Sequence, residues 1–196
     1  MALSSYQDLQ ATVTRFGKRP DIADLIPDFI ALAEVSLNRV LRTTQQRTHY
    51  SITPTTACVS LPTDLCKIVK VSYGGHPLDA IPESRTATDP AYQQDIGYSI
   101  HGGKLFLQVP SLGSVLRIEY FQELEPLSDA NVSNWLLEDA PDVYLYASLI
   151  QLALYIRDDA RLQIWTQAYT QVLNDLIDSD KDSQLAQNTP LTMKAG

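Results

Sequence analysis

The sequence predicts an α+β fold in which helices from both ends of the chain form one bundle and an antiparallel β-domain is inserted between them. Apolar residues recur at helical spacing before residue 46 and again after residue 123. Between these stretches, short runs rich in Val, Ile, Tyr and Thr are divided by Pro and Gly, as in a small sheet. Neither terminal helical segment can cover its own apolar face, so the two must close into one bundle.

Four parts follow along the chain. Residues 1–46 supply the N-terminal helices of the bundle and residues 47–122 the inserted antiparallel β-domain. Residues 123–180 supply the C-terminal helices, and residues 181–196 are predicted to be an extended arm, because they show little periodicity. A chain of 196 residues, 44% of them hydrophobic, suits one compact domain or two small lobes.

Two helices are predicted in the N-terminal part. Ser4 or Ser5 caps the first helix, and Gly17 ends it. Pro27 is tolerated only in the first turn of a helix, so the second helix begins near Ile26. The residues of the two apolar stripes are Leu9, Val13 and Phe16 in the first helix, and Phe29, Ala33, Leu37, Val40 and Leu41 in the second.

The β-domain is expected to be a small antiparallel sheet or sandwich of short strands. The pairs Gly74-Gly75 and Gly102-Gly103 punctuate two hairpins. Apolar and polar residues alternate through 115–121, which indicates a strand with one buried face. The polar segment 83–95 is predicted to be a loop or a single helical turn.

The C-terminal part contains an unusually apolar helix. Between residues 143 and 156 only Ser148 and Gln151 are plainly polar, so this helix needs neighbours on several sides. A second, amphipathic helix begins near Ala160 and runs antiparallel to it. The residues predicted to lie at a subunit or bundle interface are Trp135, Leu136, Tyr144, Tyr146, Leu149, Leu152, Tyr155 and Trp165.

Charge and composition exclude several classes of protein. The formal net charge is −8, and residues 123–182 carry twelve acidic and three basic side chains, a balance of −9. This negative charge argues against a protein that binds the phosphate backbone of nucleic acids tightly. The apolar run of fourteen residues at 143–156 is shorter than the roughly twenty that a bilayer span needs. Cys58 and Cys66 do not have a metal-binding spacing, and we expect them to be reduced.

No catalytic, cofactor-binding or metal-binding residue is predicted. The three histidines are scattered, no G-x-S-x-G motif is present, and strands rather than helices follow the glycine pairs. Acidic pairs could in principle serve a glycoside hydrolase, but each also fits a helix start, a solvated corner or an outer helix face. These pairs are Glu138 and Asp139, Asp158 and Asp159, and Asp175 and Asp178.

Four stretches resemble the phage adaptor proteins, the head-to-tail connectors that are similar to the tail tubular protein A of short-tailed phages. They are "DLIPDFIALAEVSLNRVLR", "SLPTDLCKIVKVSYGGHPL", "YSIHGGKLFL" and "SNWLLEDAPDVYLYASLIQLALYIRDDARLQIW". The last stretch is the most specific. The resemblance runs from about residue 6 to residue 178, nearly the whole chain and in the family's order.

The resemblance implies a structural virion protein at the head-tail junction, made in the host cytoplasm, with no enzymatic activity and no cofactor. About twelve copies would form a ring below the portal protein, extend the DNA channel and carry a downstream tail or nozzle protein. DNA would pass without specific binding, which fits the acidic 123–182 region. The helix at 143–156 would then also contact the next subunit, and Tyr146→Ala or Leu149→Asp should weaken assembly more than folding if those side chains face that subunit. The arm would bind the portal through Leu185, Pro190, Leu191 and Met193.

Two other functions make different structural predictions. A tail-associated glycan hydrolase needs two carboxylates facing each other across a cleft, roughly 5–10 Å apart. A carbohydrate-binding module needs exposed aromatic side chains aligned on one sheet face, for which the candidates are Tyr73, Tyr92 and Tyr98.

Overall fold

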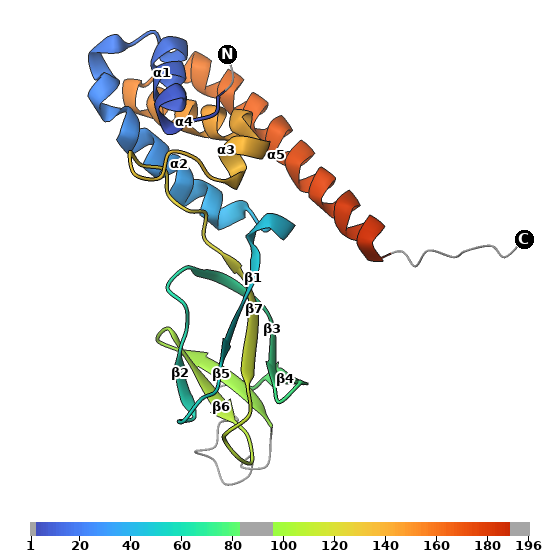
Figure 1. The fold of residues 1–196 in the computed structure, drawn as a ribbon. Helices are drawn as coiled ribbons and strands as arrows, with labels where there is room; N and C mark the ends of the chain where they lie inside the picture. The colour runs from blue at the N-terminus through green and yellow to red at the C-terminus, as the bar shows by residue number, and fades with distance from the viewer. Residues whose placement is uncertain (1–2, 83–95, 189–196) are drawn as a thin grey trace, which may run out of the picture. The chain divides into compact units, whose positions relative to one another are not determined.

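A computed structural model describes residues 3–82 and 96–188 of the chain (Figure 1). The chain divides into a helical unit, built from the residues up to Gln45 and those from Leu124 onward, and a β unit, Gln46–Glu123. Helices from both ends of the chain therefore flank the sheet in the sequence, which confirms the α+β class.

The helical unit begins with two α-helices joined by a short 3-10 segment. These are α1 (Tyr6–Gly17), η1 (Pro20–Leu25) and α2 (Ile26–Val40), after which the 3-10 turn η2 (Thr44–Gln46) leads to the sheet. After the β unit come α3 (Trp135–Asp139), α4 (Pro141–Ile156) and α5 (Asp159–Asn188).

Helix α1 begins with the predicted serine cap. The backbone N–H of Asp8 donates to Ser5 Oγ at 3.2 Å, which satisfies one of the free donors at the helix start. Leu9 and Val13 are fully buried, but the prediction for Phe16 was wrong, since this side chain is 46% exposed. Gly17 takes the buried position in the last turn, where a Cβ atom would come within 2.8 Å of Leu152 Cδ1.

The apolar stripe of α2 is confirmed apart from one residue. Phe29, Ala33, Leu37 and Leu41 are buried, whereas Val40 is 49% exposed. The helix starts at Ile26 with a proline in its first turn, as the sequence predicted.

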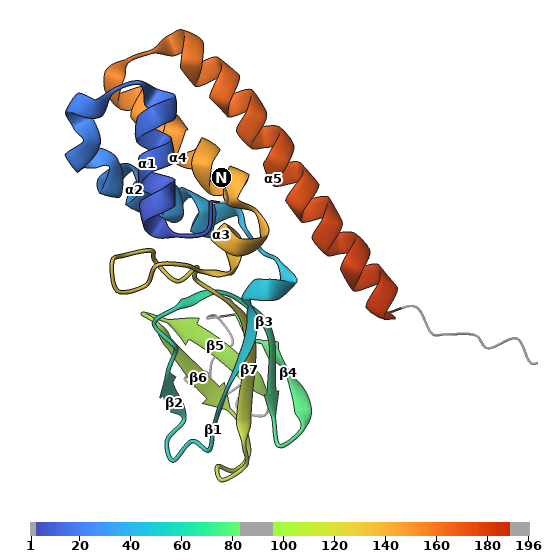
Figure 2. The ribbon, with the colours of Figure 1, turned by 45° about the horizontal axis from the view of Figure 1, so that its top comes forward.

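The β unit is one curled sheet of seven strands in the order β1-β7-β3-β4-β5-β6-β2 (Figure 2). The strands are β1 (Arg47–Ile52), β2 (Cys58–Ser60), β3 (Leu65–Tyr73), β4 (His76–Ala80), β5 (Gly97–His101), β6 (Lys104–Gln108) and β7 (Leu116–Gln122). Both predicted Gly-Gly hairpins are present, joining β3 to β4 and β5 to β6. Their glycines have φ between 54° and 85°, which side chains other than glycine adopt at a cost.

The prediction of a purely antiparallel sheet was wrong at one place. Strands β4 and β5 pair in parallel, through Asp79 with Gly97 and Ala80 with Tyr98. A parallel pair needs a long connection, and residues 81–96 supply it. The predicted loop or helical turn at 83–95 lies outside the described residues.

One face of the sheet forms the core of the β unit. In β7, Leu116, Ile118 and Tyr120 are buried and the residues between them are more exposed, so the predicted alternation is confirmed. The buried members of this core are Val59, Val71, Leu78, Leu105, Leu107, Leu116, Ile118 and Tyr120.

Helix α5 corrects the predicted boundary of the C-terminal arm. The helix continues to Asn188, so residues 181–188 are helical rather than extended. Polar contacts one helical turn apart support this stretch: Lys181 Nζ lies 2.8 Å from Asp178 Oδ1, and Gln184 Nε2 donates to Asp180 Oδ2 at 2.7 Å. Contacts between polar side chains do not produce an apolar periodicity, so the sequence pattern did not predict a helix over residues 181–188.

Candidate functional site

The residues predicted at a subunit or bundle interface fall into two groups in the structure. Tyr155 is 57% exposed, and Trp135 and Tyr146 are half-buried against the core of the helical unit. The other five belong to that core itself: Leu136, Tyr144, Leu149, Leu152 and Trp165.

Helix α4 lies at the centre of the helical unit. It contacts α1, α2, α3 and α5, and Figure 1 shows it between the N-terminal helices and α5. Its apolar circumference is therefore covered by helices of the same chain and does not by itself require a second subunit. Only the last turn stays open, where Leu154 and Tyr155 are more than half exposed. The Tyr155 ring also lies 5.4 Å from the ring of Phe29 in α2.

Further apolar side chains of the helical unit are open to contact. Leu32, Val35 and Val40 of α2 are 49–52% exposed, and Ile164 of α5 is 64% exposed. Leu32, Val35 and Ile164 were missed because they stand off the apolar stripes of their helices, where single apolar residues carry no signal.

A buried polar network crosses the helical unit, and sequence reasoning missed it. Glu34 of α2 is 6% exposed, and its Oε1 accepts hydrogen bonds from Tyr144 Oη at 3.0 Å and from the Leu127 backbone N–H at 2.8 Å. Asn134 Nδ2 donates to Tyr144 Oη at 2.8 Å and to the Glu125 carbonyl at 2.7 Å. A glutamate inside the buried face of an amphipathic helix was the available signal.

The network fixes the segment between the sheet and α3 on the surface of α2. Asn38, one turn beyond Glu34, accepts the Leu124 backbone N–H on Oδ1 at 2.8 Å. Asn134 Oδ1 in turn caps α3 by accepting the Leu137 N–H at 3.1 Å. Burial raises the pKa of the Glu34 carboxyl, and the bonds from Leu127 and Tyr144 oppose that rise. The oxygens and nitrogens in these bonds therefore hold the segment before α3, α2 and α4 together.

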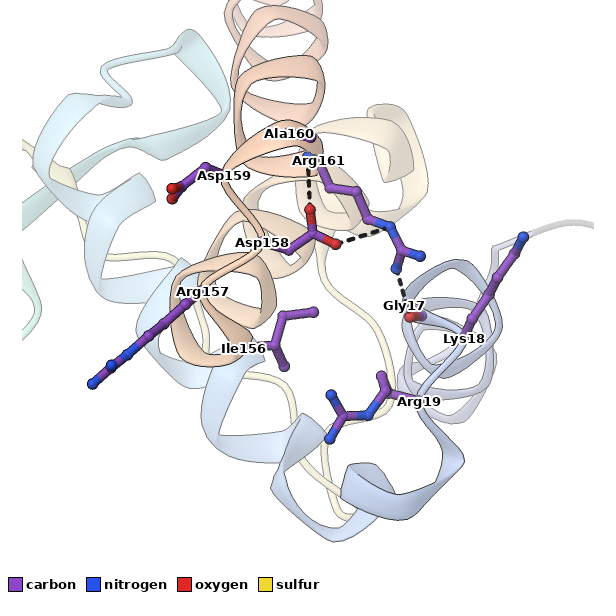
Figure 3. A pocket seen from close by; sticks show the side chains of 9 residues that line it. All are labelled: Gly17, Lys18, Arg19, Ile156, Arg157, Asp158, Asp159, Ala160 and Arg161. Carbon is purple, nitrogen blue, oxygen red and sulfur yellow. Dashed lines mark hydrogen bonds and ion pairs between the residues drawn. The ribbon is translucent and has the colours of Figure 1, made fainter.

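A depression of about 550 Å³ lies where the end of α1 meets the corner between α4 and α5 (Figure 3). Asp158 caps α5, since its Oδ1 accepts the Arg161 backbone N–H at 3.1 Å, and its Oδ2 pairs with Arg161 Nε at 3.2 Å. Arg161 Nη1 donates to the Gly17 carbonyl at 2.9 Å. The Asp158 and Arg161 pair therefore ties the end of α1 to the corner, which explains Asp158 without any catalytic role.

Two basic residues at this depression have an unfavourable backbone conformation. Lys18 (φ 52°) and Arg157 (φ 55°) are the only non-glycine residues with positive φ in the described part of the chain. Each follows the last turn of a helix, α1 and α4 respectively. A left-handed residue with a side chain costs about 1–2 kcal/mol relative to glycine, whereas a cation at a helix C-terminus contributes about 0.3–1 kcal/mol. Capping alone therefore does not account for a lysine and an arginine here.

A second depression, of about 260 Å³, contains two carboxylates and is the nearest match to a hydrolase site. It is lined in part by Asp139, one of the predicted acidic candidates, and by Asp180. Both oxygens of Asp180 accept bonds from the chain, Oδ1 from the Thr44 N–H and Oδ2 from Gln184 Nε2. Asp139 Oδ2 accepts from Gln45 Nε2 at 3.2 Å. These bonds hold α5 and α3 to the segment after α2, which gives both carboxylates a structural role.

The other acidic candidates also have positions that fit a structural role. Glu138 accepts a hydrogen bond from Ser133 Oγ at 2.9 Å, and Asp159 is exposed at the start of α5. Asp175 and Asp178 are exposed on the outer face of α5.

The tyrosines predicted for a carbohydrate platform do not line an exposed sheet face. Tyr73 and Tyr98 pack partly buried against the core of the β unit. The Tyr73 hydroxyl donates to the Ser111 carbonyl and accepts the Ser114 N–H, both at 3.0 Å, and so fixes the 111–114 turn. Tyr92 lies outside the described residues.

Within residues 3–82 and 96–188, no group of His, Cys, Asp and Glu is arranged to hold a metal ion. Cys58 and Cys66 do not form a disulfide in the described part of the chain. None of the helices described is long and apolar enough to cross a membrane.

Most of the predicted portal-binding arm falls beyond the part of the chain that the structure describes. Pro190, Leu191 and Met193 lie outside it, and Leu185 is part of the α5 backbone.

Comparison with known proteins bears on the whole chain. A search of the curated proteins finds no match. The family model of the SU10 adaptor protein matches residues 4–194, which span nearly all of both units described above and most of the predicted arm. The chain therefore belongs to the SU10 adaptor protein family.

Proposed function

We propose that this protein is the ring-forming adaptor that joins a phage head to its tail. Membership of an adaptor family makes it a structural phage protein and a component of the virion, associated with portal and tail proteins. About twelve copies would form a ring below the portal, extend its DNA channel and carry the tail or nozzle protein. The single observation that carries this proposal is the family match over nearly the whole chain.

The charge of the chain supports a channel through which DNA slides. Residues 123–182 carry a charge balance of −9. Acidic groups that face a channel repel the phosphates of DNA. They do not displace the counterions of the phosphates, and that displacement is what makes DNA binding tight.

The arm is proposed to bind the portal. Leu185, Pro190, Leu191 and Met193 supply apolar groups that would be buried on docking.

The test is the mass of the protein alone and mixed with its portal, measured by light scattering behind a sizing column. A ring-sized complex that forms with the portal supports the proposal. A monomer whose mass does not change in the presence of the portal contradicts it. A Leu191→Ser, Met193→Ser variant separates the two parts of the proposal, because loss of portal binding by a folded protein assigns that contact to the arm.

A further inference from the structure

The depression at the α4–α5 corner is rich in positive charge, in a chain whose net charge is −8. Four cationic side chains line it: Lys18, Arg19, Arg157 and Arg161. Asp158 and Asp159 also line it, and Asp158 is engaged by Arg161. Figure 3 shows Arg19 and Arg161 toward the middle of the depression and Lys18 and Arg157 extending outward at its sides.

The two outer cations have no partner in the described part of the chain. Arg19 is held by Asp21, with its Nε and Nη2 each donating to a carboxylate oxygen at 2.7 Å. Arg161 is held by Asp158 and by the Gly17 carbonyl. By contrast, the side chains of Lys18 and Arg157 are exposed and form no hydrogen bond or ion pair with any described residue. They are also the two non-glycine residues that end α1 and α4 in the left-handed conformation.

The acidic counterpart of this depression lies farther along α5. Asp175, Asp178 and Asp182 are exposed and stand at i, i+3 and i+7, so they share one face of the helix. Asp178 pairs with Lys181, but both side chains are at least 64% exposed, and such a pair is weak and easily exchanged.

One molecule cannot bring these two surfaces together. Arg161 and Asp178 are on the same helix, seventeen positions apart, which at a rise of 1.5 Å per residue corresponds to roughly 25 Å. That distance is far beyond the reach of an ion pair, so any pairing must be between molecules. Two different, complementary surfaces on one subunit form a head-to-tail contact, which closes into a ring when the rotation allows it.

We propose that the depression formed by Lys18, Arg19, Arg157 and Arg161 receives the acidic α5 face, Asp175, Asp178 and Asp182, of a second copy of this chain. This inference rests on the proposed ring and names one of its subunit contacts. The outer cations, Lys18 and Arg157, provide the charges that are free to pair with the incoming carboxylates, and Arg19 and Arg161 line the floor.

Charge exchange between the two surfaces tests the contact. In a Lys18→Glu, Arg157→Glu variant, the amount of ring formed with the portal should fall at least tenfold. In an Asp175→Lys, Asp178→Lys variant it should fall by a similar factor. An equimolar mixture of the two variants should assemble again, because each altered surface then meets an oppositely charged one. Light scattering reports assembly, and circular dichroism should show both variants folded as the wild type is.

A matched variant on the β unit controls for the change in net charge. Lys67→Glu with Lys104→Glu changes the net charge as much as the first variant does, on exposed residues of the β unit, and should assemble normally. If the wild type fails to assemble with the portal, the proposed function is wrong and this inference with it. If the wild type assembles and either charge variant does too, or the mixture stays unassembled, this inference alone is wrong. Binding of a short DNA duplex that is lost in Lys18→Glu, Arg157→Glu would assign the depression to phosphate instead and overturn it.

Discussion

The hydroxyl group of Tyr144 in α4 donates a hydrogen bond to Glu34 Oε1 in α2 at 3.0 Å. Tyr144 is fully buried in the core, and Glu34 is 6% exposed. The same Glu34 oxygen accepts the Leu127 N–H, and the Tyr144 hydroxyl also accepts from Asn134. Burial raises the pKa of the Tyr144 hydroxyl, so it remains a donor at any ordinary pH. The central helix of the unit is therefore positioned by a polar contact as well as by apolar packing.

The raised pKa of Glu34 predicts a specific pH dependence of stability. The folded state binds a proton on Glu34 more readily than the unfolded state, whose carboxyl titrates near the ordinary value of 4.5. Glu34 therefore makes its full contribution to the free energy of unfolding at pH values below the unfolded pKa of 4.5. This contribution is lost as the pH rises through the higher pKa of the folded state. Glu34→Gln keeps an acceptor oxygen and cannot ionise, so this part of the pH dependence should disappear. Urea unfolding of both proteins across this pH range checks it; parallel stability curves would contradict the prediction.

Two neighbouring positions in α4 should respond in opposite directions. Leu149 is fully buried, so Leu149→Ala should destabilise the protein by about 2–5 kcal/mol through lost contacts and a cavity. Ser148 is also fully buried, and its hydroxyl has no hydrogen-bond partner among the described residues. Ser148→Ala should therefore stabilise the protein by about 1 kcal/mol. Chemical denaturation measures both; a destabilised Ser148→Ala would indicate that the hydroxyl is bonded. The expectation that Leu149→Asp affects assembly more than folding required this side chain to face a neighbouring subunit, and the structure instead buries it fully within its own helical unit.

Local signals in the sequence predicted much of the fold. The serine cap of α1, the proline in the first turn of α2 and the two Gly-Gly hairpins each depend on a few adjacent residues, and all are present. Seven runs of β-forming residues likewise became seven strands. Such features are set by backbone geometry and nearby hydrogen bonds, so no knowledge of distant contacts is needed.

The features that were missed depend on contacts between distant residues. The parallel pairing of β4 with β5 joins two strands that residues 81–96 separate in the chain, and periodicity does not record which strands pair or in which direction. The end of α5 is supported by polar contacts one turn apart, so it resembles an arm in sequence. Five of the eight residues predicted at a subunit or bundle interface lie in the core of the bundle. The sequence could not separate the two alternatives, because an apolar helix at the centre of one subunit has the same pattern as one shared between two.

Gly97 should be irreplaceable at the parallel pair. A Cβ atom there would lie 2.5 Å from the Asp79 carbonyl oxygen and 2.6 Å from Ile81 Cγ1, and the backbone oxygen cannot move without breaking the β4–β5 pairing. Gly97→Ala should therefore lower the stability of the β unit by about 1–3 kcal/mol or more. Gly75→Asn is the matched control, since that position is open and asparagine tolerates its φ of 85°. Thermal unfolding followed by circular dichroism distinguishes them, and equal losses in the two variants would refute the role given to Gly97.

Tyr155 should affect assembly more than folding. Its side chain is 57% exposed and contacts Phe29 through one ring edge, so Tyr155→Ala removes little buried surface and should lower stability by about 1 kcal/mol or less. An exposed tyrosine at the open end of an apolar helix is well suited to anchor a neighbouring subunit, because it buries a large ring and keeps a hydroxyl for hydrogen bonding. The prediction is a reduced ring fraction with the portal at nearly unchanged denaturation midpoint. Leu32→Ala, at a similarly exposed site on α2, is the comparison. If Tyr155→Ala assembles as well as the wild type, the ring contact lies elsewhere on the helical unit or on the β unit.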